Sequence, residues 1–146
     1  MLSNQTPEKN KTIVRELYEE ILNTGKFELL ADIISANYEG PRGIKGPEGF
    51  AIAIRPVRAA FPDVHWTIED MIAEDDKVVV MWSWTGTNTA SFDGFPVSHA
   101  SVTHHAISIF QFHDGKIIKG WMQADRLGFY QQIGVISADA VKPRVN

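Results

Sequence analysis

Two residues able to carry acid/base chemistry stand near the ends of the segment 101–125, which reads SVTHHAISIFQFHDGKIIKGWMQAD. Asp114-Gly115 is a strong signal for a tight β-hairpin turn, because both residues tolerate the positive φ that such turns require. Counting back from this turn sets His104 opposite Asp125. Directly opposed side chains on one face of a hairpin lie close enough to interact. A carboxylate beside an imidazole is a candidate acid/base pair, so we predict that His104 and Asp125 are catalytic.

Aromatic and amide side chains are expected around this pair. Along the hairpin, side chains alternate between the two faces, so Phe110, Trp121 and Gln123 share the face of His104 and Asp125. Two tyrosines from the helical part of the chain can reach the same cavity. Together with tryptophans of an earlier strand pair, the residues predicted to bind a substrate are Trp121, Gln123, Trp66, Trp82, Phe110, Tyr18 and Tyr38.

Helical periodicity covers the first part of the chain. A helix is expected from about Pro7 to Asn23, with Thr6 as its cap. A short helix should end near Ile34, and a third should run from Pro47 to roughly Ala60. Pro56 lies inside this third helix and should kink or split it, because proline removes one backbone hydrogen bond.

Strand periodicity begins at Val64. The stretch 64–87 reads as two strands, and a three-residue loop at 74–76 keeps its aromatic residues on one face. A polar loop over 88–100 follows. After it come the hairpin and a short helix over 127–133. Helices that precede an antiparallel sheet indicate an α+β fold with an apolar cup suited to a small apolar molecule. The pairs expected from this loop are Trp66 with Trp84, Ile68 with Trp82, and Ile72 with Val78.

The opposite face of the last hairpin is also apolar, with Ile107, Ile109, Ile118 and Met122 on it. The predicted helices can cover one face of this hairpin, and the other face needs another cover. A second subunit is the simplest cover for the other, so we predict a homodimer through the outer face of the sheet.

Composition limits the function classes. The 146 residues suit one domain, 1–146, with a core of about 7–134 and a tail over 135–146 that is expected to be mobile from Ser137. A net charge of −4 without a basic stripe argues against nucleic acid as a partner. No apolar run is long enough for a membrane span, and MLSNQTPEKNK lacks the apolar core of a signal peptide. With no cysteine, thiol chemistry is excluded and a cytoplasmic location is expected. Neither a metal nor a cofactor is expected.

Several short motifs occur in an order that is specific for one family. They resemble the SnoaL-like polyketide cyclases, which belong to the wider group with the nuclear-transport-factor-2 fold, also called cystatin-like. The resemblance covers roughly residues 7–134 and implies a cone-shaped α+β fold, with three N-terminal helices on a strongly curved antiparallel sheet. The motifs are FPDVHWTIED (61–70), DDKVVVMWSWTGT (75–87), DGFP (93–96), FHDGKIIKGWMQAD (112–125) and LGFYQQIG (127–134).

The resemblance implies an enzyme that closes a ring by a cofactor-free intramolecular aldol reaction on a polyketide ester. Asp125 matches the family's acid/base aspartate, which would take a proton from an activated carbon and return it to the alkoxide after the enolate attacks a carbonyl. Apolar neighbours such as Trp121 would raise the pKa of the carboxyl group, and His104 or Gln123 would donate to the oxyanion.

Three alternatives remain open. The first is a non-catalytic module that holds an apolar ligand, in which Asp125 only caps the terminal helix. The second is proton transfer as in ketosteroid isomerase, with Asp125 as base and Tyr18 as donor. The third, epoxide hydrolysis as in limonene-epoxide hydrolases, is disfavoured because no arginine lies between Arg58 and Arg126 to complete an aspartate–arginine–aspartate relay on the strands.

Overall fold

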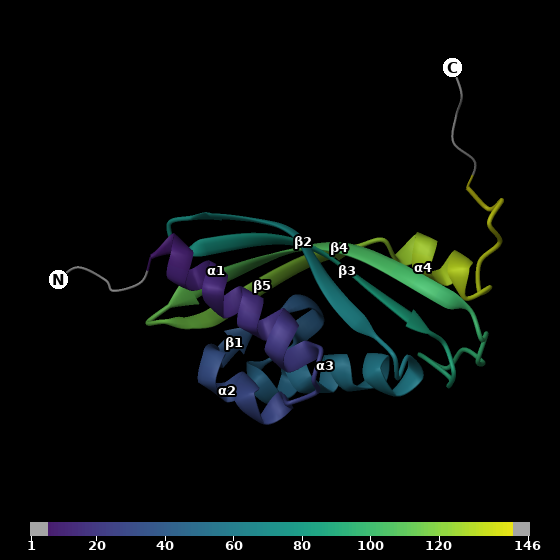
Figure 1. Cartoon of the computed structure of the whole chain (residues 1–146), viewed down its shortest axis with the longest axis horizontal. Coiled ribbons are helices and arrows are strands. Elements are labelled where there is room, and N and C mark those ends of the chain that lie inside the picture. The colour runs from purple at the N-terminus through teal and green to yellow at the C-terminus, as the bar shows by residue number, and fades with distance from the viewer. Residues whose placement is uncertain (1–5, 142–146) are drawn as a thin grey trace, which may run out of the picture.

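A curved five-stranded sheet arches over a layer of helices in the computed structural model, which describes residues 6–141 (Figure 1). The α+β class predicted from the sequence is confirmed. The strand order is β1-β5-β4-β3-β2, with β1 parallel to β5 and every other neighbouring pair antiparallel. Residues 142–146 of the expected tail lie outside the described part, as do residues 1–5. The strands are β1 (Ile34–Glu39), β2 (His65–Glu74), β3 (Lys77–Thr87), β4 (Ser101–His113) and β5 (Lys116–Ala124).

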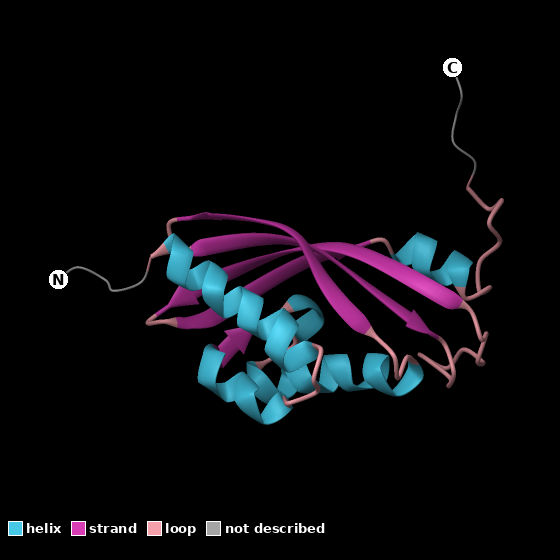
Figure 2. Ribbon diagram, in the orientation of Figure 1, coloured by secondary structure: helices cyan, strands magenta, loops and turns pink. Residues whose placement is uncertain are grey.

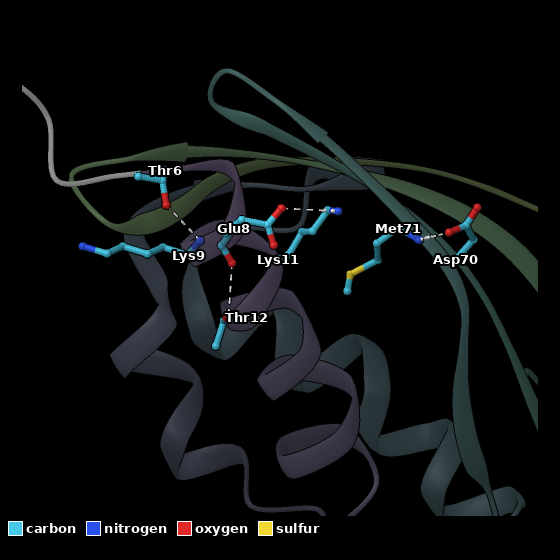
Figure 3. Close-up of polar contacts among 7 residues, drawn as sticks. All are labelled: Thr6, Glu8, Lys9, Lys11, Thr12, Asp70 and Met71. Atoms are coloured by element: carbon cyan, nitrogen blue, oxygen red, sulfur yellow. Dashed lines mark hydrogen bonds and ion pairs between the residues drawn. The ribbon is translucent and has the colours of Figure 1, made fainter.

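The first predicted helix is confirmed, with a change of winding inside it. α1 (Pro7–Glu16) continues directly into a π-helical turn, η1 (Leu17–Leu22). Thr6 Oγ1 accepts a hydrogen bond from the Lys9 amide at 3.1 Å, so the predicted cap forms (Figure 3). The Lys11 ammonium lies 3.7 Å from the Glu8 carboxylate in the same turn. The remaining helices are η2 (Phe27–Leu29), α2 (Leu30–Ile33), η3 (Pro41–Gly43), α3 (Gly46–Ala60) and α4 (Arg126–Gln132).

Pro56 does not split α3. The sequence predicted either a kink or a split at this residue, and the split is wrong. The helix runs unbroken through Pro56. Because proline has no amide hydrogen, the backbone carbonyl of Ile52, four residues earlier, lacks its helical hydrogen bond. Ile52 is 60% exposed. Water can therefore replace the missing donor. Figure 2 shows α1, α2 and α3 together on one side of the sheet, with α4 at the far end of the strands.

The β2–β3 hairpin has a shorter turn than predicted and a compensating bulge. Glu74 pairs with Lys77, so the loop holds Asp75 and Asp76 alone. The register shifts between Ile68 and Asp70, which restores the expected pairs Trp66–Trp84 and Ile68–Trp82. The predicted pairing of Ile72 with Val78 is wrong, because Val78 pairs with Ala73. Beside the bulge, Asp70 Oδ1 accepts from the Met71 amide at 2.8 Å (Figure 3).

The β4–β5 hairpin turns at Asp114-Gly115 as predicted. After the first two residue pairs, however, its register shifts by one residue. His113 pairs with Lys116 and Phe112 with Ile117, and the next pair is Gln111 with Lys119. Ile118 is thus an extra residue on β5. A bulge of one residue moves every later side chain of that strand to the opposite face. All predicted pairs beyond Phe112–Ile117 are therefore wrong.

The outer face of the sheet carries several exposed apolar side chains. Ile72, Met81, Ile107 and Trp121 lie there, each at least 40% exposed. Met122, which was expected on this face, pairs with the buried Ser108 and points inward. In Figure 1 none of the described elements covers this side. A second copy as its cover stays a prediction. Within residues 6–141, no helix combines the length and apolar character that a membrane crossing requires.

Candidate functional site

A cavity of about 490 Å³ lies between the inner face of the sheet and the helices. Its size is in the range of pockets that hold small organic ligands. Most of the wall is aromatic or aliphatic, from η1, α3, β3 and β4, and α4 lines one end. Among the predicted site residues, those that line it are Tyr18, Tyr38, Trp66, Trp82, His104, Phe110 and Trp121.

His104 is a titratable residue that lies among aromatic rings at the α4 end of the cavity. Its ring centroid lies 5.5 Å from Trp84, 6.2 Å from Trp82 and 5.1 Å from Phe129. Its Nδ1 atom is buried and has no hydrogen-bond partner among the described residues. Because His104 lines the cavity, we infer that Nε2 is the nitrogen available to a molecule there. An imidazole held in this way can accept a proton from a bound compound.

The packing of α4 on β4 fixes this arrangement. The side chain of Gln132 accepts from the Thr103 amide at 2.8 Å and donates to the Thr103 carbonyl at 2.9 Å. These bonds fasten the last turn of α4 beside the residue that precedes His104. Phe129 of the same helix is buried and covers the imidazole.

Burial lowers the pKa of His104 below its ordinary value, and the charges of His105 and Arg126 add to this effect, while the Asp125 carboxylate opposes it. The folded state therefore favours the neutral imidazole. The unfolded chain binds the proton more readily, so this contribution to stability is present above about pH 6.5 and is lost as the pH falls through the lower pKa of the folded state. We expect urea unfolding of His104→Gln to depend less on pH in that window than the wild type. Equal pH dependence in both proteins would contradict this assignment.

Asp125 does not face His104 as predicted. The Asp125 amide donates to the carbonyl of His105 at 2.9 Å, which is one residue out of the expected register. The side chain is exposed, does not line the cavity, and accepts from the Gly128 amide at 3.0 Å as the N-cap of α4. The helix-capping alternative thus describes its contacts. Its charge still acts on the imidazole through space.

The bulge at Ile118 also relocates two predicted substrate contacts. Gln123 pairs with Ile107, is exposed and does not line the cavity. Trp121 borders the cavity, yet its pairing with Ile109 turns its side chain to the outer face. There the Lys119 ammonium lies 5.0 Å from the centroid of its indole ring. Gly120, Met122 and Ala124 take the inward positions on β5 instead.

A hydrogen-bonded chain crosses the cavity wall further along β4. The Trp82 indole Nε1 donates to Ser108 Oγ at 3.0 Å, and the Ser108 hydroxyl is hydrogen-bonded to the Tyr18 phenol. Desolvation raises the pKa of Tyr18 strongly, and burial raises the pKa of Tyr38 to about 12, so both phenols are neutral donors at ordinary pH. Gly120 leaves room for one of them, because a Cβ there would lie 2.5 Å from the Tyr38 hydroxyl oxygen.

Sequence reasoning missed Ser108 and Arg126. Ser108 shares the alternation of His104 and Phe110, so parity along β4 could have identified it. Arg126 had no such signal. It begins α4, lines the cavity, and donates from Nη2 to the Tyr130 hydroxyl at 3.2 Å. In the described range 6–141, no three histidine, aspartate or glutamate side chains gather closely enough to hold a metal ion.

Comparison with known proteins identifies the family. The profile described as SnoaL-like polyketide cyclase matches residues 12–133. The chain belongs to this family. A search of curated proteins finds no significant match. Among the solved structures similar to this SnoaL-like chain is a candidate polyketide cyclase from Bacillus cereus ATCC 10987, with 30% identity, a TM-score of 0.77, and coverage of 93% of this chain and 87% of that one.

Two further solved structures share the fold of this SnoaL-like protein. TsrD from Streptomyces laurentii has a TM-score of 0.84 at 24% identity, covering 91% of this chain and 100% of that one. IdmH, a candidate polyketide cyclase from Streptomyces antibioticus, has a TM-score of 0.74 at 24% identity, covering 86% of this chain and 98% of that one. These two likenesses bear out the expected curved α+β fold.

Proposed function

We propose that this SnoaL-like protein catalyses cofactor-free proton transfer at a carbon next to a carbonyl group, on a small apolar ketone or ester bound in the cavity. The observation that supports it best is the His104 imidazole, which lines the cavity among aromatic rings and whose burial favours the neutral form. A neutral imidazole is a base matched to ordinary pH.

The chemistry follows from this placement. His104 Nε2 removes a proton from the carbon, and the electron pair of the C–H bond moves to the carbonyl oxygen to give an enolate. The guanidinium of Arg126, at the same end of the cavity, offsets the charge on that oxygen. In a cyclisation, the enolate carbon then attacks a second carbonyl of the same molecule. The imidazolium returns its proton to the resulting alkoxide.

Asp125 would act on this reaction through charge. Its carboxylate favours the imidazolium form of His104, which is the form that follows proton abstraction. Its exposed position and its bond to Gly128 argue against direct contact with a substrate. This differs from the acid/base role that the family resemblance implies for the aspartate.

The second candidate function is non-catalytic binding of a small apolar ligand. The position of Asp125 favours it, because the carboxylate to which the family resemblance gives the acid/base role does not line the cavity. Proton exchange separates the two functions. The probe is para-diacetylbenzene, an enolisable apolar ketone. If the protein is a catalyst, deuterium from D₂O should enter the methyl groups faster with the protein than in buffer alone. Binding of the ketone without any acceleration would leave only the binding function.

Substitution of Asp125 with asparagine and with alanine separates its two roles. Asparagine caps a helix as well as aspartate does, so Asp125→Asn should keep the stability of the wild type, whereas Asp125→Ala should cost about 0.5–2 kcal/mol. If the charge supports catalysis, both variants lower the exchange rate, measured by proton NMR in D₂O. An Asp125→Asn variant with the exchange rate of the wild type would limit this residue to its helix cap.

A further inference from the structure

The edge of β4 extends beyond the end of β5. The last backbone hydrogen bond on this side of β4 runs from the Asp125 amide to the His105 carbonyl at 2.9 Å. Alternate residues of a strand direct their backbone groups to the same edge, so the amide and carbonyl of Thr103 face the side where β5 has already ended. The Gln132 side chain occupies this position. It makes the two bonds with Thr103 that a neighbouring strand residue would make, at 2.8 and 2.9 Å.

A carboxamide suits every contact at this point. The two hydrogens of Gln132 Nε2 serve the Thr103 carbonyl and the Gly128 carbonyl, the latter at 3.1 Å, while Oε1 accepts from the Thr103 amide. A carboxylate of the same shape supplies no donor, and an apolar side chain of the same length supplies neither donor nor acceptor. Gly128 also donates its amide to Asp125 Oδ1 at 3.0 Å. The bonds at the two ends of α4 therefore meet at this glycine.

Phe129, the residue that covers His104, lies between the bonded positions of α4. It directly follows Gly128, and its ring centroid is 5.1 Å from that of His104. Gln132 comes three residues after Phe129, so the two side chains share one face of the helix. Gln132 is itself exposed and does not line the cavity. Its influence on the site therefore passes through the placement of α4, and not through contact with a bound molecule.

We propose that Gln132 is a positioning residue, whose bonds to Thr103 seat the last turn of α4 so that Phe129 packs over His104. Its effect on the rate rests on the proposed function, whereas its effect on the packing of the imidazole does not. Thr103 and Gln132 are both exposed, so water can replace their mutual bonds with little loss of overall stability. Water cannot replace the fixed distance between the helix and the strand.

The test compares Gln132→Met with Gln131→Met by NMR titration of the histidine side chains. Methionine keeps the length and the helix propensity of glutamine but forms none of the three hydrogen bonds. Gln131 is the matched control, because its side chain donates to the Ser137 carbonyl at 3.1 Å and makes no bond to β4. In Gln132→Met the pKa of His104 should rise toward its ordinary value, because burial is the main cause that lowers it. In Gln131→Met this pKa should stay at the wild-type value.

The charged groups around the imidazole are left unchanged by these substitutions. Asp125 and Arg126 at the start of α4 and His105 on β4 act on its pKa through charge, and methionine is as neutral as glutamine. From β3, the rings of Trp82 and Trp84 face the imidazole, and neither carries a charge. A raised pKa in Gln132→Met therefore reports lost burial. Three histidines elsewhere serve as internal references, and their titration curves should coincide in all three proteins: His65, His99 and His113.

The rate of exchange should fall while binding of the ketone persists. With para-diacetylbenzene at saturation in D₂O, Gln132→Met should lower the rate of deuterium incorporation by up to about 10²-fold, the loss that a misplacement of about 1 Å can cause. The ketone concentration that gives half the maximal rate should stay within a few-fold, because every residue of the cavity wall is kept. Gln131→Met should match the wild type in both quantities.

A second pair of variants keeps the shape of the side chain. Gln132→Glu retains the acceptor for the Thr103 amide but loses both donors, so it should raise the pKa of His104 and slow the exchange. Gln131→Glu adds the same charge one residue away and measures the part of the change that charge alone produces. An effect of Gln132→Glu no larger than that of Gln131→Glu would contradict a role for the lost donors.

Equal pKa values of His104 in Gln132→Met and Gln131→Met would overturn the positioning role, as would a loss of exchange that arises from weaker ketone binding alone. A raised pKa together with the exchange rate of the wild type would confine Gln132 to helix packing and remove it from catalysis. Failure of the proposed function gives a different result. The wild type would then show no exchange above buffer, while the pKa of His104 would still respond to Gln132→Met and not to Gln131→Met.

Discussion

Replacing His104 with glutamine should lower the rate of deuterium exchange into a bound methyl ketone by about 10²–10⁴-fold, the usual contribution of a positioned general base. Glutamine keeps a polar side chain of similar length but cannot accept the proton. The imidazole packs against Trp84 and Phe129 in the cavity wall, and these contacts fix its position there. The exchange is followed by proton NMR with para-diacetylbenzene in D₂O.

The matched control is the adjacent histidine. His105 is exposed and does not line the cavity, so His105→Gln should keep the exchange rate of the wild type. Binding of the ketone to His104→Gln, measured by tryptophan fluorescence, should remain within a few-fold. If His104→Gln exchanges as fast as His105→Gln, another group is the base and the proposed function needs a different catalytic residue.

Phe61→Ala should lower the free energy of unfolding by about 3–5 kcal/mol, the range for removal of a buried phenylalanine. Phe61 is 0% exposed, and its ring lies 4.8 Å from Trp84, 5.8 Å from Phe92 and 6.0 Å from Phe129. Two of these rings also contact His104. The cavity left by the substitution should therefore loosen the support of the imidazole as well. Urea denaturation measures the stability.

Leu127→Ala provides the comparison for Phe61→Ala. Leu127 is an apolar residue of α4 that is 40% exposed, so its truncation should change stability far less. Ketone exchange by the folded fraction of Phe61→Ala should also be slower than that of Leu127→Ala. A Phe61→Ala protein as stable as Leu127→Ala would mean that the aromatic cluster between the sheet and α4 contributes little to the fold.

Local signals in the sequence were enough to predict the elements and one face of the sheet. Thr6 and Pro7 mark the start of α1, and Asp114-Gly115 marks the last turn, because these residue types have strong conformational preferences of their own. The alternation along β4 correctly set His104 and Phe110 on the cavity side. Tyr18 and Tyr38 were also correctly assigned to the cavity.

The errors have one common source. Glu69 in β2 and Ile118 in β5 each add a residue to one strand of a hairpin, and the adjacent residue types do not signal this. At β2 the bulge restored the predicted aromatic pairs. At β5 it reversed the facing of Trp121 and Gln123 and left Asp125 outside the cavity.

The sequence by itself determined the α+β class, the family resemblance, the positions of the turns and the inward stripe of β4, because these depend on preferences of neighbouring residues. The tertiary structure decided which residues meet in the cavity. A bulge forms in a strand when it improves the packing of that strand against distant elements. The residues of the strand alone do not reveal this improvement in packing. The folded chain brings together segments that are far apart in sequence. It sets Phe129 against His104, links Trp82 through Ser108 to Tyr18, and places Arg126 in the cavity wall.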